Sequence, residues 1–217
     1  MAGAAAPLTI AVDGPAASGK GTIARALARH FALPHLDTGA LYRAVALSAL
    51  RQGVGLADSG RLAALAHAFD FTLLEDAALR DDRTAVAASI VSAVPEVRAA
   101  LLDLQRGFAD RGDGAVLDGR DIGTVIMPQA RVKLFVTAAP GVRAHRRFLE
   151  LLERGVDARE EEVLADIQAR DARDSGRSAA PLRRAADSIL LDTSQVGKDE
   201  AVRMAIDLVE ARLGKAA

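Results

Sequence analysis

Short apolar runs alternate with longer helical stretches along most of the chain. The strand-like runs are Leu8–Val12, His35–Asp37, Ala115–Asp118, Val132–Val136 and Ser188–Leu191. The first and fourth runs are almost wholly apolar, which is typical of parallel strands that are buried on both faces of a sheet. This alternation predicts an α/β fold with a five-stranded parallel sheet and helices on both faces.

The helical stretches differ along the chain. Residues 23–31 repeat at helical spacing after the first strand, and residues 202–213 form an amphipathic helix near the C-terminus. Between residues 51 and 113 the alternation gives way to helical pieces with one strand candidate, Asp70–Leu74. We interpret this middle segment as an insertion over the sheet.

Length and composition add only modest limits to the predicted fold and class of protein. The chain has 217 residues, half of them hydrophobic, which suits one compact domain with a sizeable core. A net charge of −1 argues against a nucleic-acid-binding surface, and the absence of cysteine excludes disulfides, cysteine metal sites and thiol nucleophiles. We see no signal peptide and no membrane span, so we expect a soluble cytoplasmic protein, and a monomer because no dimer seam is visible.

A glycine-rich loop follows the first strand and leads into a helix. It reads Gly-Pro-Ala-Ala-Ser-Gly-Lys-Gly-Thr, the pattern of a phosphate-binding loop. Gly14 and Gly19 permit backbone conformations in which N–H groups turn inward around a phosphate, and Lys20 can reach the outer phosphates. The helix dipole points at the same anion, so this context favours a nucleoside triphosphate over a glycine-rich turn with a chance lysine. The candidate binding residues are Gly14, Pro15, Ala16, Ala17, Ser18, Gly19, Lys20, Gly21 and Thr22.

The loop departs from the usual pattern at one position. That pattern has Ser or Thr directly after the lysine, whereas here Gly21 intervenes and Thr22 follows. We therefore expect the hydroxyl group of Thr22 to face Mg²⁺.

Ligands of open α/β sheets bind beyond the carboxyl ends of the strands, so polar residues just after strands are candidates for chemistry. Segments 37–43 and 118–121 follow the second and third strands. A further charged place is one face of a helix, formed by Arg170, Arg173, Asp174 and Arg177. Repulsion among its arginines predicts an anionic partner such as a triphosphate; the alternative is a solvated face on which Arg170 and Asp174 pair.

Six segments share their order and spacing with one known family. They lie at residues 14–22, 36–43, 88–89 with 95–98, 118–125, 143–147 and 170–177. Together they resemble the nucleoside monophosphate kinases and, within them, the bacterial cytidylate kinases. The resemblance implies a P-loop kinase that transfers the γ-phosphoryl group of ATP to CMP or dCMP with Mg²⁺, and that has small nucleotides as partners. It also implies one domain with a core at about 7–37, 113–168 and 185–217, an acceptor-binding insertion at about 38–112 and a short helical lid at about 169–184.

For the acceptor's phosphate, the resemblance implies Arg43 and Arg120, with Thr38 close by. Guanidinium groups suit this role because two phosphate-bearing anions must be brought together against their repulsion. The alternatives are solvated surface arginines and, for Thr38, the N-cap of a helix over 39–52, which is compatible with binding.

For the acceptor's base, the resemblance implies Ser89, Arg98 and Asp121. Asp121 would accept from the exocyclic amine of cytosine, while the other two donate to ring acceptors. Uracil has an oxygen in place of that amine, and such a buried mismatch costs roughly 1–3 kcal/mol or more. A helix-surface serine is the alternative for Ser89.

The resemblance also supplies the remaining roles. The implied catalytic residues, which stabilise charge on the transferring group, are Lys20, Arg120, Arg170 and Arg173. Three residues of the lid also reach the acceptor nucleotide, namely Arg170, Asp174 and Arg177. Three further arginines have two equally good explanations, namely contacts with ATP or a plain amphipathic helix. They are Arg143, Arg146 and Arg147.

One segment departs from the family. Bacterial cytidylate kinases carry a small antiparallel sheet in the insertion, and here the stretch 70–88 is shorter, although Leu79 and Arg80 resemble its end. The sequence therefore leaves open whether this sheet is present.

Two other classes of protein share the phosphate loop. Membership in the shikimate- or gluconate-type kinases would not explain why Ser89, Arg98 and Asp121 occur together. A nucleotide-dependent switch or motor is a second class, but the chain has no Asn-Lys-x-Asp guanine signature, and Gly-Arg follows Asp118 where such an ATPase often has an acidic residue. Rapid ADP release that depends on an acceptor would exclude the switch.

Overall fold

The computed structural model describes residues 7–214, which divide into two compact units. The first unit comprises residues 7–35 and 109–214, and the second is Leu36–Phe108. The second unit covers most of the segment that the sequence assigns to the insertion, about 38–112.

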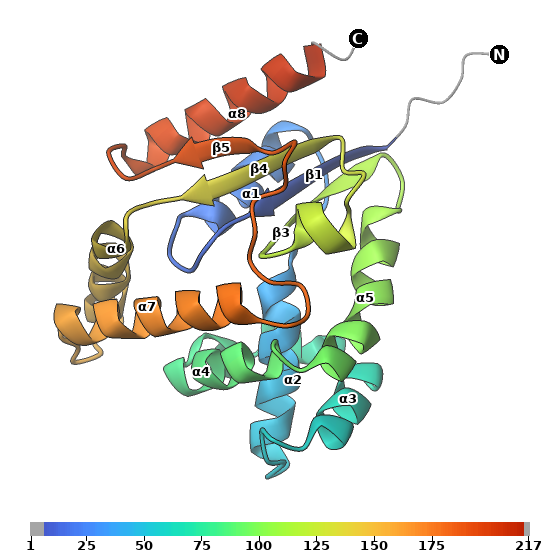
Figure 1. Ribbon diagram of the computed structural model, residues 1–217, viewed down its shortest axis with the longest axis vertical. Helices are drawn as coiled ribbons and strands as arrows, with labels where there is room; N and C mark the ends of the chain where they lie inside the picture. Colours follow the sequence, from blue (N-terminus) through green and yellow to red (C-terminus); the bar gives the residue numbers. More distant parts are fainter. Residues whose placement is uncertain (1–6, 215–217) are drawn as a thin grey trace. The chain divides into compact units, whose positions relative to one another are not determined.

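A five-stranded sheet forms the centre of the first unit (Figure 1). Its strands are β1 (Leu8–Asp13), β2 (His35–Asp37), β3 (Gly114–Gly119), β4 (Val132–Thr137) and β5 (Ile189–Asp192). The strand order is β2-β3-β1-β4-β5, and β1 pairs in parallel with β3 and β4, as β4 does with β5. The chain passes into the second unit within β2. The predicted parallel sheet is confirmed, and each strand lies within one residue of its predicted bounds.

Side-chain alternation along the strands separates the two faces of the sheet. Ile10, Val12 and Leu134 pack with α1 (Lys20–His30) and α8 (Lys198–Gly214) in one apolar core. Asp13 and Lys133 alternate with these residues, so their side chains lie on the other face. There they contact the π turn η3 (Ile122–Ile126), which follows β3.

Close backbone approach fixes one end of the sheet. Gly114 begins β3 opposite Leu8, with a φ of +122°. A Cβ atom at Gly114 would lie 2.1 Å from the carbonyl oxygen of Leu8, so this position requires glycine.

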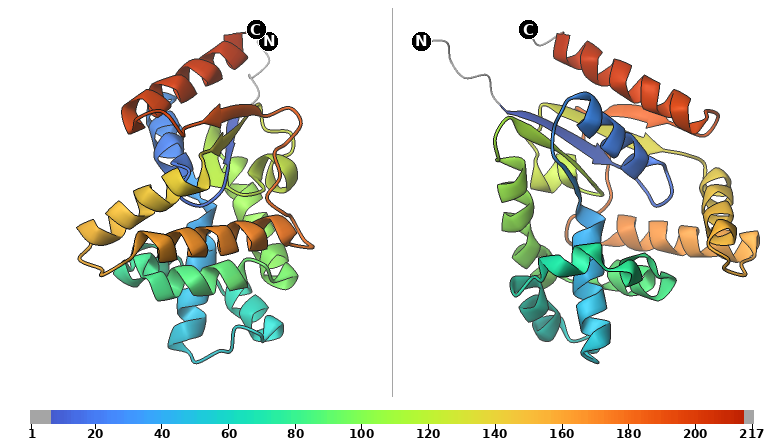
Figure 2. Two further views of the ribbon diagram at one scale, coloured as in Figure 1. Left: turned by 60° about the vertical axis from the view of Figure 1, so that its left-hand side comes forward. Right: turned by 180° about the vertical axis from the view of Figure 1, so that it is seen from behind.

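The helices α6 (Pro140–Glu153) and α7 (Glu160–Gly176) follow one another in the chain and pack against each other, meeting near one end and crossing at an angle (Figure 2). Their shared apolar core contains Ala144, Leu151, Val163 and Ile167. Proline in the first turn of α6, and three glutamates in the first turn of α7, suit helix N-termini. The segment predicted as a lid, about 169–184, is helical only as far as Gly176.

After β2, the second unit consists of helices and helical turns joined by loops. Its elements are α2 (Thr38–Arg51), α3 (Ser59–His67), η1 (Phe71–Glu75), η2 (Ala77–Arg80), α4 (Asp82–Val91) and α5 (Pro95–Ala109), the last of which ends just beyond the unit. Leu41, Val45, Leu62, Val91 and Leu101 are fully buried or nearly so and belong to its apolar core.

The predicted strand at Asp70–Leu74 is wrong. Phe71–Glu75 forms a 3₁₀ turn, because the Asp70 carboxylate accepts hydrogen bonds from the amide and the hydroxyl of Thr72 at 2.9 and 2.6 Å. Asp76 begins η2 in the same way, accepting from the amide of Ala78 at 2.9 Å. Residues 38–113, all of which the structure describes, contain no strand, so the small antiparallel sheet of the insertion is absent.

Within residues 7–214, none of the helices alone has the length and apolar character that a membrane crossing requires. One pair that is bent by 98°, α4 with α5, meets the test together by length and composition.

Candidate active site

The phosphate loop joins β1 to α1 through a tight backbone path. Gly19, the N-cap of α1, has a left-handed conformation with a φ of +86°, and Ala17 has a φ of +56°. A Cβ atom at Gly14 would lie 2.0 Å from the carbonyl oxygen of Val136. The loop thus has the glycine-dependent geometry that its sequence predicts.

The start of α1 is suited to a phosphate. No side chain caps this N-terminus, and the first turn carries no acidic residue, so the helix dipole favours an anion there. The hydroxyl oxygen of Ser18 is buried without a hydrogen-bond partner among the described residues. An orphaned hydroxyl beside uncapped amides fits a triphosphate.

Oxygen atoms near Gly21 fit a magnesium ion held mainly by phosphate. The hydroxyl of Thr22 contacts the guanidinium of Arg25 at 3.5 Å, and a carboxylate oxygen of Asp118 lies 3.7 Å from where a Cβ of Gly21 would be. His35 contacts the other oxygen of Asp118 at 2.7 Å. No cluster of three or more His, Cys, Asp or Glu within residues 7–214 could hold a metal alone. Mg²⁺ at this point would therefore take most of its ligands from phosphate and water.

A buried carboxylate links the loop to the segment after β3. Asp13, the last residue of β1, accepts hydrogen bonds from the amides of Ile122 and Gly123, both at 2.8 Å. Burial raises the pKa of Asp13 to about 7, against the effect of these two bonds. Asp13 thereby fixes the turn that begins directly after Asp121.

A second buried carboxylate gathers arginines at the end of α7. Asp174 is 1 % exposed and accepts from Nε of Arg120 at 2.7 Å and from Nη2 of Arg177, which caps the helix. Burial acts to raise the pKa of Asp174, but the positive charges of Arg120, Arg177 and Arg170 outweigh it, and the pKa is lowered. Asp174 is therefore a buried carboxylate that holds two guanidinium groups in place.

Comparison with known proteins identifies the family. The sequence profile of cytidylate kinase matches residues 10–211. The chain is 57% identical over 204 residues to the cytidylate kinase of Rhodopseudomonas palustris strain BisA53, covering 94% of this chain and 97% of that one. It is 57% identical over 205 residues to the cytidylate kinase of Xanthobacter autotrophicus, covering 94% and 98%.

The chain belongs to the cytidylate kinase family. The resemblance seen in the sequence is confirmed. A gluconokinase from Sinorhizobium meliloti shares the fold alone, with a TM-score of 0.52 and 16% identity over 97% of this chain and 94% of that one. Membership in the cytidylate kinase family excludes the gluconate-type kinases and the nucleotide-dependent switches as the family of this chain.

The predicted acceptor residues of this cytidylate kinase family member come from both units. The second unit carries Thr38, Arg43, Ser89 and Arg98, and the first carries Arg120, Asp121, Arg170, Asp174 and Arg177. Within the first unit the structure brings together Arg120, Arg170, Asp174 and Arg177, whereas Arg173 is exposed. The alternative of a solvated face is wrong at Asp174, because Asp174 is buried and bonds to Arg120 and Arg177.

The first turn of α2 differs from the prediction. Asp37, not Thr38, is the N-cap, and its carboxylate accepts from the amide of Ala40 at 3.2 Å. The same carboxylate accepts from Arg43 at 2.6 Å, which holds this guanidinium over the start of the helix. Thr38 is the first helical residue and is buried.

Ser89 and Arg98 are connected through the turn between α4 and α5. The hydroxyl of Ser92 donates to the carbonyl oxygen of Ser89 at 3.1 Å, and Arg98 donates to the carbonyl oxygen of Ser92 at 3.2 Å. Arg98 also lies over the ring of Tyr42, 5.5 Å from its centroid. Ser89 is 2 % exposed, so the alternative of a helix-surface serine is wrong.

Two of the three arginines of α6 have structural partners that neither explanation from the sequence includes, whereas Arg147 pairs with Glu150 on the same helix. Arg143 donates to the carbonyl oxygen of Ala16 and to Asp171, and Arg146 donates to Thr193. A plain amphipathic helix does not account for these bonds.

Sequence reasoning missed Asp13, Asp171 and Thr193. Asp13 had a usable signal, namely a charged residue that ends an apolar strand just before the loop. Asp171 and Thr193 had none, because their partners lie 28 and up to 175 residues away in the sequence.

Proposed function

We propose that this protein is an ATP-dependent kinase that converts CMP or dCMP to CDP or dCDP, with ADP as the second product, in pyrimidine nucleotide metabolism. The observation that carries the proposal is 57% identity to cytidylate kinases over 94% of the chain. The family profile matches residues 10–211, a range that contains the phosphate loop. The site geometry in each unit is compatible with it.

The donor side is assigned to residues 14–22. The inward-facing amides and Lys20 bind the phosphates of ATP, the Ser18 hydroxyl gains a partner there, and Thr22 offers its hydroxyl to Mg²⁺. The metal, when bound, neutralises charge on the outer phosphates.

The transfer itself requires positioning and charge neutralisation. An oxygen of the acceptor's phosphate forms a bond to the γ-phosphorus as the bond to the bridging oxygen of ADP breaks. That acceptor oxygen is already ionised at neutral pH, so no general base is needed. Charge on the transferring group is stabilised by Lys20, Arg120, Arg170 and Arg173.

The acceptor side is assigned by the family's motifs. Arg43, Arg120 and Thr38 bind the phosphate of CMP. The base and ribose are bound by Ser89, Arg98, Asp121, Arg170, Asp174 and Arg177. A carboxylate at Asp121 accepts from the amine of cytosine and repels the oxygen that uracil has there.

Location and assembly belong to the same proposal. A cytoplasmic enzyme has ATP and nucleoside monophosphates at hand, and a monomer with only small nucleotides as partners suits a chain whose proposed site residues all come from one copy.

The direct test is ADP formation from Mg-ATP with CMP, dCMP, UMP, AMP or no acceptor. We expect strong turnover with CMP or dCMP and little with UMP. Asp121→Asn should lower the ratio of kcat/KM for CMP over UMP by roughly 5- to 150-fold, which corresponds to about 1–3 kcal/mol. Equal rates with every acceptor, or none, would contradict the proposed activity.

A further inference from the structure

A buried arginine of α6 contacts both the phosphate loop and α7. Arg143 is 3 % exposed, and each of its three nitrogens has an acceptor. Nε donates to the carbonyl oxygen of Ala138 at 2.9 Å, and Nη1 donates to the carbonyl oxygen of Ala16 at 3.1 Å. Nη1 and Nη2 donate to the two carboxylate oxygens of Asp171 at 3.1 and 2.6 Å. A buried guanidinium whose three nitrogens are all hydrogen-bonded is a built structural contact rather than an incidental surface pair.

The bond to Ala16 constrains how the loop faces its ligand. In a peptide unit the N–H and C=O groups point in opposite directions, so a carbonyl held toward α6 leaves the amide of the next residue facing away from it. Thr193 acts similarly at Ser18, because its hydroxyl lies 3.1 Å from the carbonyl oxygen of Ser18 and shares its one proton between this oxygen and that of Thr137, also at 3.1 Å. Arg146 in turn donates to the backbone carbonyl of Thr193 at 2.6 Å. Arg143 and Thr193 therefore hold two carbonyl groups of the loop. In this way they orient the amides of the loop toward a phosphate.

The bond to Asp171 brings α7 into the same arrangement. Asp171 follows Arg170 and lies three residues before Asp174, on the helix that carries the predicted lid residues. Ala17 of the loop also packs against the apolar core shared by α6 and α7. One guanidinium thus joins the loop backbone to the helix of the lid arginines.

We propose that Arg143 is a positioning residue for ATP, which holds the phosphate loop in its binding conformation and couples it to α7 through Asp171. The inference rests on triphosphate binding by the loop and not on which acceptor is phosphorylated. Arg143 acts from behind the loop, through Ala16, without touching the nucleotide.

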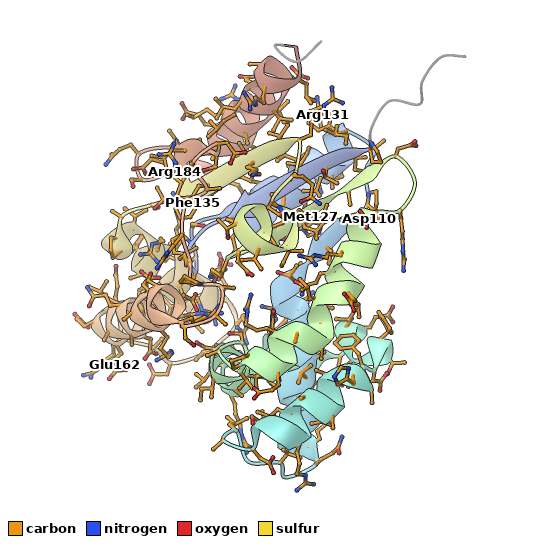
Figure 3. The ribbon with its side chains drawn as sticks, turned by 45° about the vertical axis from the view of Figure 1, so that its right-hand side comes forward. Asp110, Met127, Arg131, Phe135, Glu162 and Arg184 are labelled. Atoms are coloured by element: carbon orange, nitrogen blue, oxygen red, sulfur yellow. The ribbon has the colours of Figure 1, made fainter. Side chains whose placement is uncertain are left out.

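Two conservative variants test this role, with a matched control on α7. Asp171→Asn removes the charge and one acceptor oxygen, and Arg143→Lys keeps the charge but cannot reach three acceptors at once. Glu162→Gln is the control, because it also neutralises a carboxylate paired with an arginine, Arg159, but on the exposed outer side of α7 (Figure 3). The Kd for Mg-ATP is measured by calorimetric titration without acceptor, beside KM for ATP, KM for CMP and the melting temperature.

Each test variant should raise the Kd and the KM for ATP about tenfold, while KM for CMP stays within about twofold. The double variant should weaken ATP binding no more than the worse single variant, because both act through one bond. Glu162→Gln should bind ATP as the wild type does.

Three results would overturn the inference: wild-type affinity in Asp171→Asn, an equal loss in Glu162→Gln, or additive losses in the double variant. If Arg143→Lys does not fold, Asp171→Asn with an unchanged melting temperature decides alone. A wild-type protein that binds Mg-ATP but phosphorylates no pyrimidine nucleotide would contradict the proposed function. The comparison of ATP affinity between the test variants and Glu162→Gln would still decide the role of Arg143.

Discussion

Two buried carboxylates of the first unit differ in their partners and in their chemistry. Asp13, at the end of β1, is 4 % exposed and accepts from two backbone amides. Asp174, at the end of α7, is 1 % exposed and accepts from two guanidinium groups. Burial raises the pKa of Asp13 to about 7, whereas the arginines lower the pKa of Asp174 despite its burial.

The difference shows what offsets the loss of hydration at a carboxylate. Amide dipoles stabilise the ionised form of Asp13 too weakly to balance burial, and the negative charge of Asp121 opposes them. At Asp174 the full positive charges of the arginines more than balance the effect of burial. At neutral pH Asp174 is a permanent anion, while Asp13 exchanges a proton.

The largest expected effect comes from removing the charge of Asp174. Asp174→Asn leaves Arg120 and Arg177 facing each other with little solvent, and we expect it to lower the free energy of unfolding by about 3–5 kcal/mol. Urea denaturation at pH 7 measures this loss. Asp166→Asn, at an exposed position of the same helix, is the control and should change stability by less than about 0.5 kcal/mol. A loss below about 1 kcal/mol in Asp174→Asn would mean that the two arginines do not depend on this carboxylate.

A smaller, pH-dependent effect is expected at Asp13. Its folded pKa of about 7 lies above the ordinary value of 3.8, so the folded state binds the proton more tightly than the unfolded state does. The stabilisation of the folded state by proton binding at Asp13 is complete below pH 3.8 and is lost as the pH rises through 7. Asn resembles the neutral acid, so the difference in unfolding free energy between wild type and Asp13→Asn isolates this group.

That difference should fall by about 2–3 kcal/mol between pH 5 and pH 7, close to 1.4 kcal/mol per pH unit, and level off above pH 8. Urea titrations of both proteins at each pH measure it. A difference that stays constant or rises with pH would show that the amides of Ile122 and Gly123 keep Asp13 ionised.

The sequence predicted the local features of this fold and missed the distant pairs. The strands could be predicted from contiguous apolar runs, and the phosphate loop from nine consecutive residues. The turn at Asp70 was mistaken for a strand, because an alternating run such as Phe-Thr-Leu does not reveal that the preceding carboxylate will bond to the backbone. Arg120 and Asp174 are 54 residues apart, and no periodicity relates residues at that separation. Arg120 and Asp174 could therefore each be named from the sequence as candidates, but not the bond between them.

The smallest expected effect completes the comparison with an exposed carboxylate. Glu150 pairs with Arg147 on α6 at 3.2 Å, one helical turn apart, and its side chain is 60 % exposed. Water hydrates both charges with or without the pair, so Glu150→Gln should change the free energy of unfolding by less than about 0.5 kcal/mol. Urea denaturation at low salt and at 1 M NaCl measures this, and salt should reduce even the small difference. A loss above 1 kcal/mol would contradict the view that burial, rather than pairing with arginine, makes Asp174 so sensitive to substitution.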